Sequence, residues 1–97
     1  MTNATFVCPA CGYDRLDQAP WQEDQYASDE ICPSCGIHFG FDDVAGGEPS
    51  ARCVIYERWR EEWMSHGCRW FSTGTAPPPG WDPHVQLSRV GQGSAGS

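Results

Sequence analysis

The 97-residue chain contains no lysine, and its six basic side chains are all arginine, against thirteen aspartates and glutamates. The formal net charge at pH 7 is therefore −7. A protein that binds nucleic acid needs a basic face to offset the phosphate charge, so this balance argues against that class. The only basic patch that the sequence offers is a modest local one, made by Arg52, Arg58, Arg60 and Arg69.

Long apolar runs are also lacking. No segment approaches the ~18 consecutive apolar residues that mark a membrane-spanning helix. The first basic residue is Arg15, so the N-terminus has no basic region and apolar core of the kind found in signal peptides. We therefore expect a cytoplasmic protein that contacts no membrane and keeps its cysteines reduced.

Cysteine, glycine, proline and aromatic residues are abundant. Five tryptophans, three tyrosines and four phenylalanines can bury large areas, which excludes a disordered chain. Six cysteines, eleven glycines and eight prolines indicate a loop-rich fold that needs a covalent or metal staple. The length allows one small domain.

Two Cys-x2-Cys pairs, Cys8/Cys11 and Cys32/Cys35, are separated by twenty residues. This is the spacing of a structural zinc ribbon, in which each pair turns two thiolates toward one ion and the two pairs complete a tetrahedron. A glycine follows each pair and can adopt the left-handed conformation that such a tight turn requires. The pattern predicts one Zn²⁺ site with these four cysteines as ligands.

These cysteines have four other possible interpretations. A disulfide framework suits secreted proteins, for which the chain shows no export signal. A Cys-Pro-x-Cys redox motif belongs at a helix N-terminus inside a βαβ unit, and the sequence shows no pattern of such a unit. The paired knuckles also resemble rubredoxin, which holds iron for electron transfer, so iron stays open as the alternative metal. His38 follows the second pair and could replace one thiolate, although four cysteines already suffice.

Cys53 and Cys68 are expected to be bystanders. They lie near opposite ends of an expected helix, where fifteen residues rise ~22 Å, whereas bridged Cα atoms lie within ~7 Å. We therefore expect two partly buried thiols rather than a disulfide.

The expected fold is a small α+β domain. Residues 1–45, which we call the ribbon half, form a zinc-ribbon or rubredoxin-like knuckle domain. It has short strands at 4–7 and 37–41 and a polar surface loop over 17–30. Residues 50–90 form a helical half that packs on it as one structural unit. Residues 91–97 form a Gly/Ser-rich, disordered tail.

Two helices are expected in the second half. The long one spans 51–66, with Ser50 as N-cap, an apolar face that includes Trp59 and Trp63, and a stop at Gly67. The short one begins at Pro83 with Asp82 as N-cap, and turns Val85 or Leu87 inward.

The stretch from Cys8 to Leu16, together with the stretch from Glu30 to Asp43, resembles the bacterial cysteine-rich CPCC-type proteins, most of which have no assigned function. The tryptophan spacing further on is also similar, so that the resemblance covers about residues 6–88. Many members read Cys-Pro-Cys-Cys where this chain has Ala10, so only the outer cysteines correspond to ligands. The resemblance implies a cytoplasmic metal-binding protein that is not an enzyme, and some such proteins are candidate immunity proteins against toxins.

The charge is concentrated in one part of the chain. Residues 14–48 hold nine acidic residues and one arginine, a balance of −8, whereas residues 49–97 balance at +1. Aromatic residues among carboxylates are typical of a protein-protein hot spot that attracts a basic partner. The expected partner surface, for example toward a basic toxin domain, comprises Trp21, Glu23, Asp24, Tyr26, Asp29 and Glu30.

Catalysis is not expected. The three histidines and the Asp42-Asp43 pair show no arrangement of nucleophile, base and orienting group. A site of four thiolates leaves no coordination position for water. Five tryptophans suggest more apolar surface than one thin core hides, and both a homodimer and a docked partner stay open.

Overall fold

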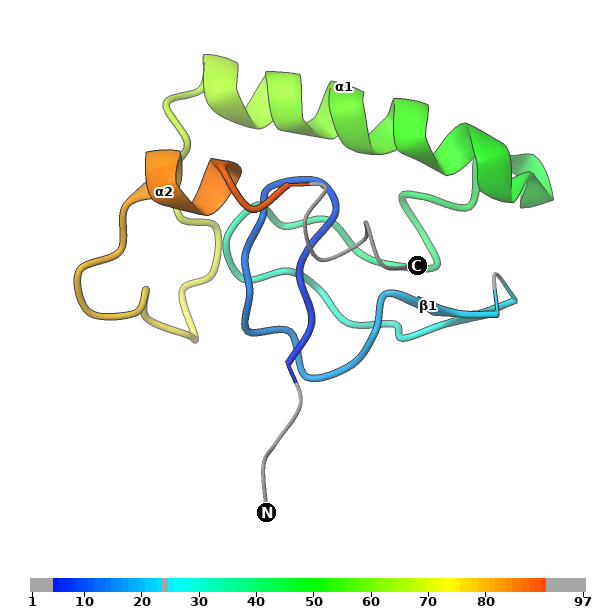
Figure 1. Cartoon of the computed structure of the whole chain (residues 1–97), viewed down its shortest axis with the longest axis horizontal. Helices are drawn as coiled ribbons and strands as arrows, with labels where there is room; N and C mark the ends of the chain where they lie inside the picture. Colours follow the sequence, from blue (N-terminus) through cyan, green and yellow to red (C-terminus); the bar gives the residue numbers. More distant parts are fainter. Residues whose placement is uncertain (1–4, 24, 91–97) are drawn as a thin grey trace.

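Two loops that carry the cysteine pairs lie at the centre of the molecule, and a long helix crosses over them (Figure 1). The structure, a computed structural model, describes residues 5–23 and 25–90, so the expected tail over 91–97 lies outside it. The elements are a two-stranded antiparallel sheet of β1 (Trp21–Gln22) and β2 (Tyr26–Ala27), the helix α1 (Arg52–Ser65) and the short helix α2 (Pro83–Leu87). A small sheet, one long helix and one short helix make up the small α+β arrangement that the sequence predicted.

The strands do not lie where the sequence predicted them. Beside the knuckles, the described residues pair only at two isolated bridges, Phe6 with Leu16 and Ile31 with His38. After His38 the chain curls at once, because the N–H groups of Phe41 and Asp42 both return to the His38 carbonyl. The expected strand over 37–41 therefore cannot extend.

The hairpin of β1 and β2 lies inside the segment that was expected to be an irregular loop. Trp21 pairs with Ala27, and Gln22 pairs with Tyr26. The turn is tight, since Gln25 donates its N–H to the Gln22 carbonyl at 3.0 Å. The many polar side chains around two aromatic residues concealed this hairpin in the sequence.

Helix α1 begins one residue later than expected and ends one residue earlier. Pro49–Ala51 forms a 3-10 turn that leads into it, and Ala51 rather than Ser50 is the N-cap, without a side-chain hydrogen bond. At the other end Gly67 has a φ of +86°, and the N–H of Cys68 closes on the Trp63 carbonyl at 2.9 Å. The predicted glycine stop is confirmed, and Trp63 is buried as expected. No helix of the described residues is long and apolar enough to cross a membrane.

A buried carboxylate joins three parts of the chain. Asp43, which is fully buried, accepts hydrogen bonds from the indole N–H of Trp21 at 2.8 Å and the hydroxyl of Tyr56 at 2.6 Å. The backbone N–H of Gly40 donates to its other oxygen at 2.7 Å. Three donors offset the cost of removing the carboxylate from water. Asp43 thus links β1 and α1 to the turn after the second knuckle.

All five tryptophans are hydrogen-bonded within the chain. Each of the five indole N–H groups donates a hydrogen bond to another residue of the chain. Three of the rings also form part of an aromatic ladder or a cation–π contact: Trp70 stands edge-on to Tyr13 and Trp81, and the Arg52 guanidinium lies 3.5 Å from the Trp21 ring centroid. The tryptophan content is therefore largely explained by internal contacts.

We predict that Tyr56→Phe destabilises the metal-loaded protein by about 1.5–3 kcal/mol, because it removes one donor from a buried carboxylate. Urea denaturation measures this loss. The matched control is Tyr26→Phe at a 61% exposed position, where we expect a change within about 0.5 kcal/mol. Equal effects of the two substitutions would show that the Tyr56–Asp43 contact is not important.

Alkaline pH gives a second readout of the same contact. Burial and the bond to Asp43 raise the pKa of Tyr56 above its ordinary value of 10.0. The unfolded chain therefore ionises first, and the stability contributed by the protonated phenol is present below about pH 10 and lost as the pH rises further. Tyr56→Phe should lose less stability over this alkaline range than the unsubstituted protein.

Candidate metal centre

The two knuckles have the same backbone structure. In each, the glycine after the pair donates its N–H to the carbonyl of the first cysteine: Gly12 to Cys8 at 2.9 Å and Gly36 to Cys32 at 2.8 Å. The first cysteine in turn donates to the carbonyl five residues further on. The φ values of Gly12 and Gly36 are +88° and +82°, which confirms the predicted left-handed turns.

The knuckle glycines also allow close packing from the helical half. A Cβ atom at position 12 would lie 2.0 Å from the carbonyl oxygen of Gln86, and one at position 36 would lie 2.5 Å from the Phe71 ring. Glycine is thus required twice at each position, once for the turn and once for the neighbour.

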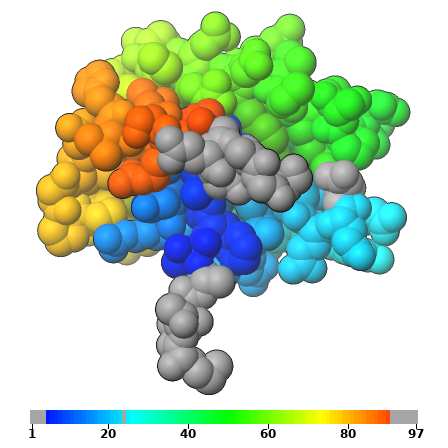
Figure 2. All heavy atoms as spheres, viewed as in Figure 1, coloured from blue at the N-terminus to red at the C-terminus, as the bar shows by residue number. Residues whose placement is uncertain are grey.

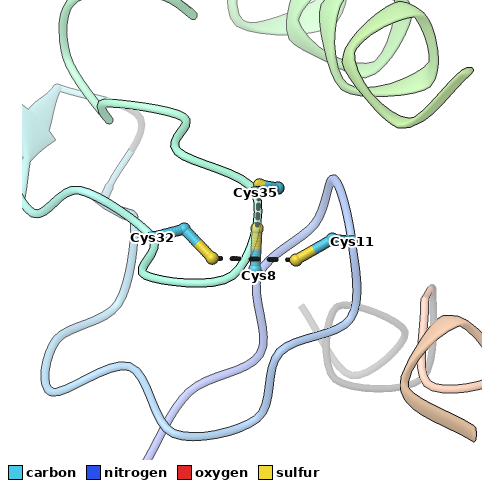
Figure 3. A group of neighbouring side chains, drawn as sticks. All are labelled: Cys8, Cys11, Cys32 and Cys35. Atoms are coloured by element: carbon cyan, nitrogen blue, oxygen red, sulfur yellow. Dashed lines mark hydrogen bonds between the residues drawn. The ribbon is translucent and has the colours of Figure 1, made fainter. Parts of the chain in front are cut away.

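The side chains of Cys8, Cys11, Cys32 and Cys35 converge on one point, as Figure 3 shows. All four Sγ atoms lie within 4.8 Å of one another, with 3.9 Å between Cys8 and Cys35 and 3.7 Å between Cys11 and Cys32. A tetrahedral ion with Zn–S distances of ~2.3 Å requires S–S edges of about 3.8 Å, whereas a disulfide requires ~2.05 Å. The four predicted ligands therefore fit a single metal ion.

Because the four cysteines are buried, their thiolate forms depend strongly on a cation between them. Cys8, Cys11 and Cys32 are fully buried and Cys35 nearly so. Burial raises the pKa of the Cys8 and Cys35 thiols. At Cys11 burial also opposes ionisation, but hydrogen bonds from Cys32, Cys35 and Cys8 outweigh it and lower the pKa. Several thiolates cannot share this volume without a positive ion between them.

Helix α1 holds the backbone of both knuckles. The Trp59 indole donates to the Cys35 carbonyl at 3.0 Å. The neighbouring Arg60 donates from Nε to the Ala10 carbonyl at 2.7 Å and from its terminal nitrogen to Pro9 at 3.0 Å. One turn of helix thus satisfies outward-facing carbonyls on each side of the cluster.

Helix α2 closes the cluster through Gln86, which is only 2% exposed. Its amide Nε2 donates to the Ser34 hydroxyl at 2.8 Å and to the Cys11 carbonyl at 3.3 Å, so that one side chain touches both knuckles. Trp81 donates to its Oε1 at 2.7 Å. Asp82 caps the helix as predicted, and of the two residues expected to face inward, Leu87 packs on the core whereas Val85 is exposed.

The sequence singled out three other side chains near the site. Cys68 is buried, whereas Cys53 is exposed and donates to the Ser50 carbonyl, so the expected partial burial of Cys53 is wrong. His38 lies outside the thiolate cluster and pairs with Asp29 at 3.4 Å.

The residues expected to bind a partner fall into two groups. Trp21 and Glu30 are engaged internally, because Trp21 donates to Asp43 and the Glu30 carboxylate accepts the backbone N–H groups of residues 17 and 18 at 3.1 and 3.3 Å. Glu23, Tyr26 and Asp29 are exposed. Asp24 lies outside the described residues.

The basic patch expected from Arg52, Arg58, Arg60 and Arg69 keeps only part of its residues at the surface. Arg52 is buried, and Arg60 donates to knuckle carbonyls. Only Arg58 and Arg69 of that set are exposed.

We predict that Cys11→Ser abolishes stoichiometric metal binding and the native amide dispersion of the ribbon half, because a structural metal contributes on the order of 10 kcal/mol to such a fold. Metal analysis and ¹⁵N correlation spectra measure both effects, and exhaustive chelation of the unsubstituted protein should reproduce them. The control is Cys53→Ser, which should retain one metal per chain. Native dispersion after complete metal removal would contradict this expectation.

We also predict that Gln86→Leu accelerates release of the metal to a chelator by roughly tenfold, since outer contacts of this kind typically change metal affinity by about 10–100-fold. The same spectra show whether the fold is retained. Val85→Ala on the exposed side of α2 should release the metal at the original rate. If both variants release it equally fast, Gln86 does not hold the knuckles together.

Comparison with known families, with curated proteins and with solved structures finds no match to this chain. The likeness to the CPCC-type proteins therefore stays a prediction from the motif.

Proposed function

We propose that the protein is a non-enzymatic module for protein-protein interaction, built around a structural Zn²⁺ ion. Cys8, Cys11, Cys32 and Cys35 would hold the ion, and the acidic surface of the ribbon half would bind a basic protein partner. A toxin domain that the protein neutralises in the cytoplasm, in the manner of an immunity protein, is the partner we favour. The observation that carries this proposal is the buried cluster of four cysteines, whose Sγ atoms lie within 4.8 Å of one another.

The surroundings of the cluster support a structural role. All four ligands are thiolates, which leave no position open for water or a substrate. Side chains of α1 and α2 cover the knuckles and bind their carbonyls. When bound, the metal would supply the folding energy that such a thin core lacks.

The exposed part of the ribbon half supports partner binding. Glu23, Tyr26 and Asp29 lie on and beside the β1–β2 hairpin, and Phe41, 74% exposed, stacks on His38, which pairs with Asp29. We call Glu23, Tyr26, Asp29 and Phe41 the hairpin surface. Aromatic residues beside carboxylates suit a partner with arginine or lysine at its centre.

A rubredoxin-like iron electron carrier is the second candidate. The repeated knuckle hydrogen bonds and the four thiolates favour it, because thiolates bind iron as well as zinc. Protein purified without added metal distinguishes the two: we expect one zinc per chain and a colourless solution. One iron per chain and a red ferric form would overturn the zinc assignment.

We predict that the double variant Glu23→Lys and Asp29→Lys weakens capture of the basic partner from source-cell lysate by roughly tenfold, through like-charge repulsion at the interface. Raising the salt concentration should weaken capture by the unsubstituted protein in the same direction. The control carries the same charge change at Glu57 and Glu61, which are exposed on α1. Equal capture by both variants would rule out the hairpin surface as the binding site.

A further inference from the structure

Among the described residues, two isolated bridges of the ribbon half each leave an edge with unpaired backbone groups. Phe6 and Leu16 exchange both of their hydrogen bonds, at 3.0 and 3.1 Å, so the neighbouring Arg15 directs its N–H and C=O away from that pairing. Ile31 forms a bridge of the other kind with His38, in which only the flanking residues bond. The N–H and C=O of Ile31 therefore also point away from the His38 segment.

These edges face each other across an open slot. The N–H of Asp17 donates to the Glu30 carboxylate at 3.1 Å, which places the first edge opposite the second. Arg15, Asp17, Glu30 and Ile31 line one cavity of about 460 Å³. Within residues 5–23 and 25–90, the backbone N–H groups of Arg15 and Ile31 meet no hydrogen-bond acceptor.

The remaining wall gives the slot an apolar side. Tyr13 and Pro33 from the knuckles line it, together with Phe71, Ser72 and Thr75 from the segment that follows α1. That segment is fixed on the second knuckle, because Phe71 and Ser72 donate to the Ser34 and Pro33 carbonyls. Ile31 and Phe71 are 48% and 58% exposed, so two large apolar side chains face the solvent here.

The charge of the slot is divided. The carboxylate of Glu30 is held by the N–H groups of residues 17 and 18, and Asp17 adds a second, exposed carboxylate at the same end. Arg15 is the one cation among the lining residues. A cationic side chain of a ligand would therefore fit beside Asp17 and Glu30 and not beside Arg15.

We propose that this slot receives an extended segment of the protein partner as an added β-strand. The segment would bond to the backbone of Arg15 and Ile31, place an apolar residue between Ile31 and Phe71, and place a lysine or arginine beside Asp17 and Glu30. A second copy of this chain fits less well, because each copy has a net charge of −7 and no lysine. The inference rests on the proposed function only in taking the ligand to be a basic protein.

The test uses the full metal-loaded chain and a defined probe, the capped octapeptide (Val-Lys)4. Titration into ¹⁵N-labelled protein should shift the amides of Arg15, Ile31 and Phe71 and slow hydrogen exchange at Arg15 and Ile31. The same peptide with alternate backbone nitrogens methylated keeps its side chains but lacks donors along one edge, and should bind at least tenfold more weakly. Asp17→Lys should weaken binding by about threefold to tenfold, whereas Glu57→Lys should not.

Three results would overturn the proposal that the slot binds a strand. These are no amide chemical-shift changes on addition of the peptide, equal binding of the methylated peptide, or shift changes confined to Glu23, Tyr26 and Asp29. The last result would keep the hairpin surface of the proposed function and reject only the slot. Concentration-dependent shifts at Arg15 and Ile31 without peptide would assign the slot to a second copy instead. Conversely, if the Glu23→Lys and Asp29→Lys variant loses partner capture but still binds the peptide, the slot and the hairpin surface are two independent binding sites.

Discussion

The convergence of four thiolates in a dry interior is the constraint on which the rest of this fold depends. Two short loops, twenty residues apart in the chain, bring their sulfur atoms within 4.8 Å of one another. The negative charge they carry when ionised has no water around it and needs a cation at its centre. The described residues of the ribbon half contain little regular sheet, and their knuckle turns are those that Gly12 and Gly36 permit.

The helical half is best understood as a cover for backbone groups. A tight turn around an ion directs peptide carbonyls outward, and buried carbonyls need donors. Trp59, Arg60 and Gln86 supply them, and they come from two helices that follow the ribbon in sequence. In the space-filling view of Figure 2, α1 runs along one side of the ribbon half and α2 lies against it. The helices and the four-cysteine cluster are thus joined by hydrogen bonds to the knuckle backbone.

Local chemistry could be predicted from the sequence, and long-range polar contacts could not. The Cys-x2-Cys-Gly strings identified the cluster and its turns, and Gly67 and the Asp82-Pro83 pair identified the ends of the helices, because each signal lies within a few residues. The burial of Asp43 and Gln86 could not be predicted, since their partners are up to 75 residues away in the chain. Trp21 was assigned to a partner surface for the same reason: its acceptor is a carboxylate 22 residues further on.

The five hydrogen-bonded indoles affect how the folding of the protein can be followed by fluorescence. Each ring reports on a different joint of the molecule: Trp21 on the Asp43 joint, Trp59 on the second knuckle, Trp63 on the end of α1, and Trp70 and Trp81 on the covering segments. The emission of an indole depends on its surroundings, so single-tryptophan versions of the chain would distinguish the order in which these joints open. A protein this small thus carries its own set of fluorophores, distributed over nearly every contact that keeps it folded.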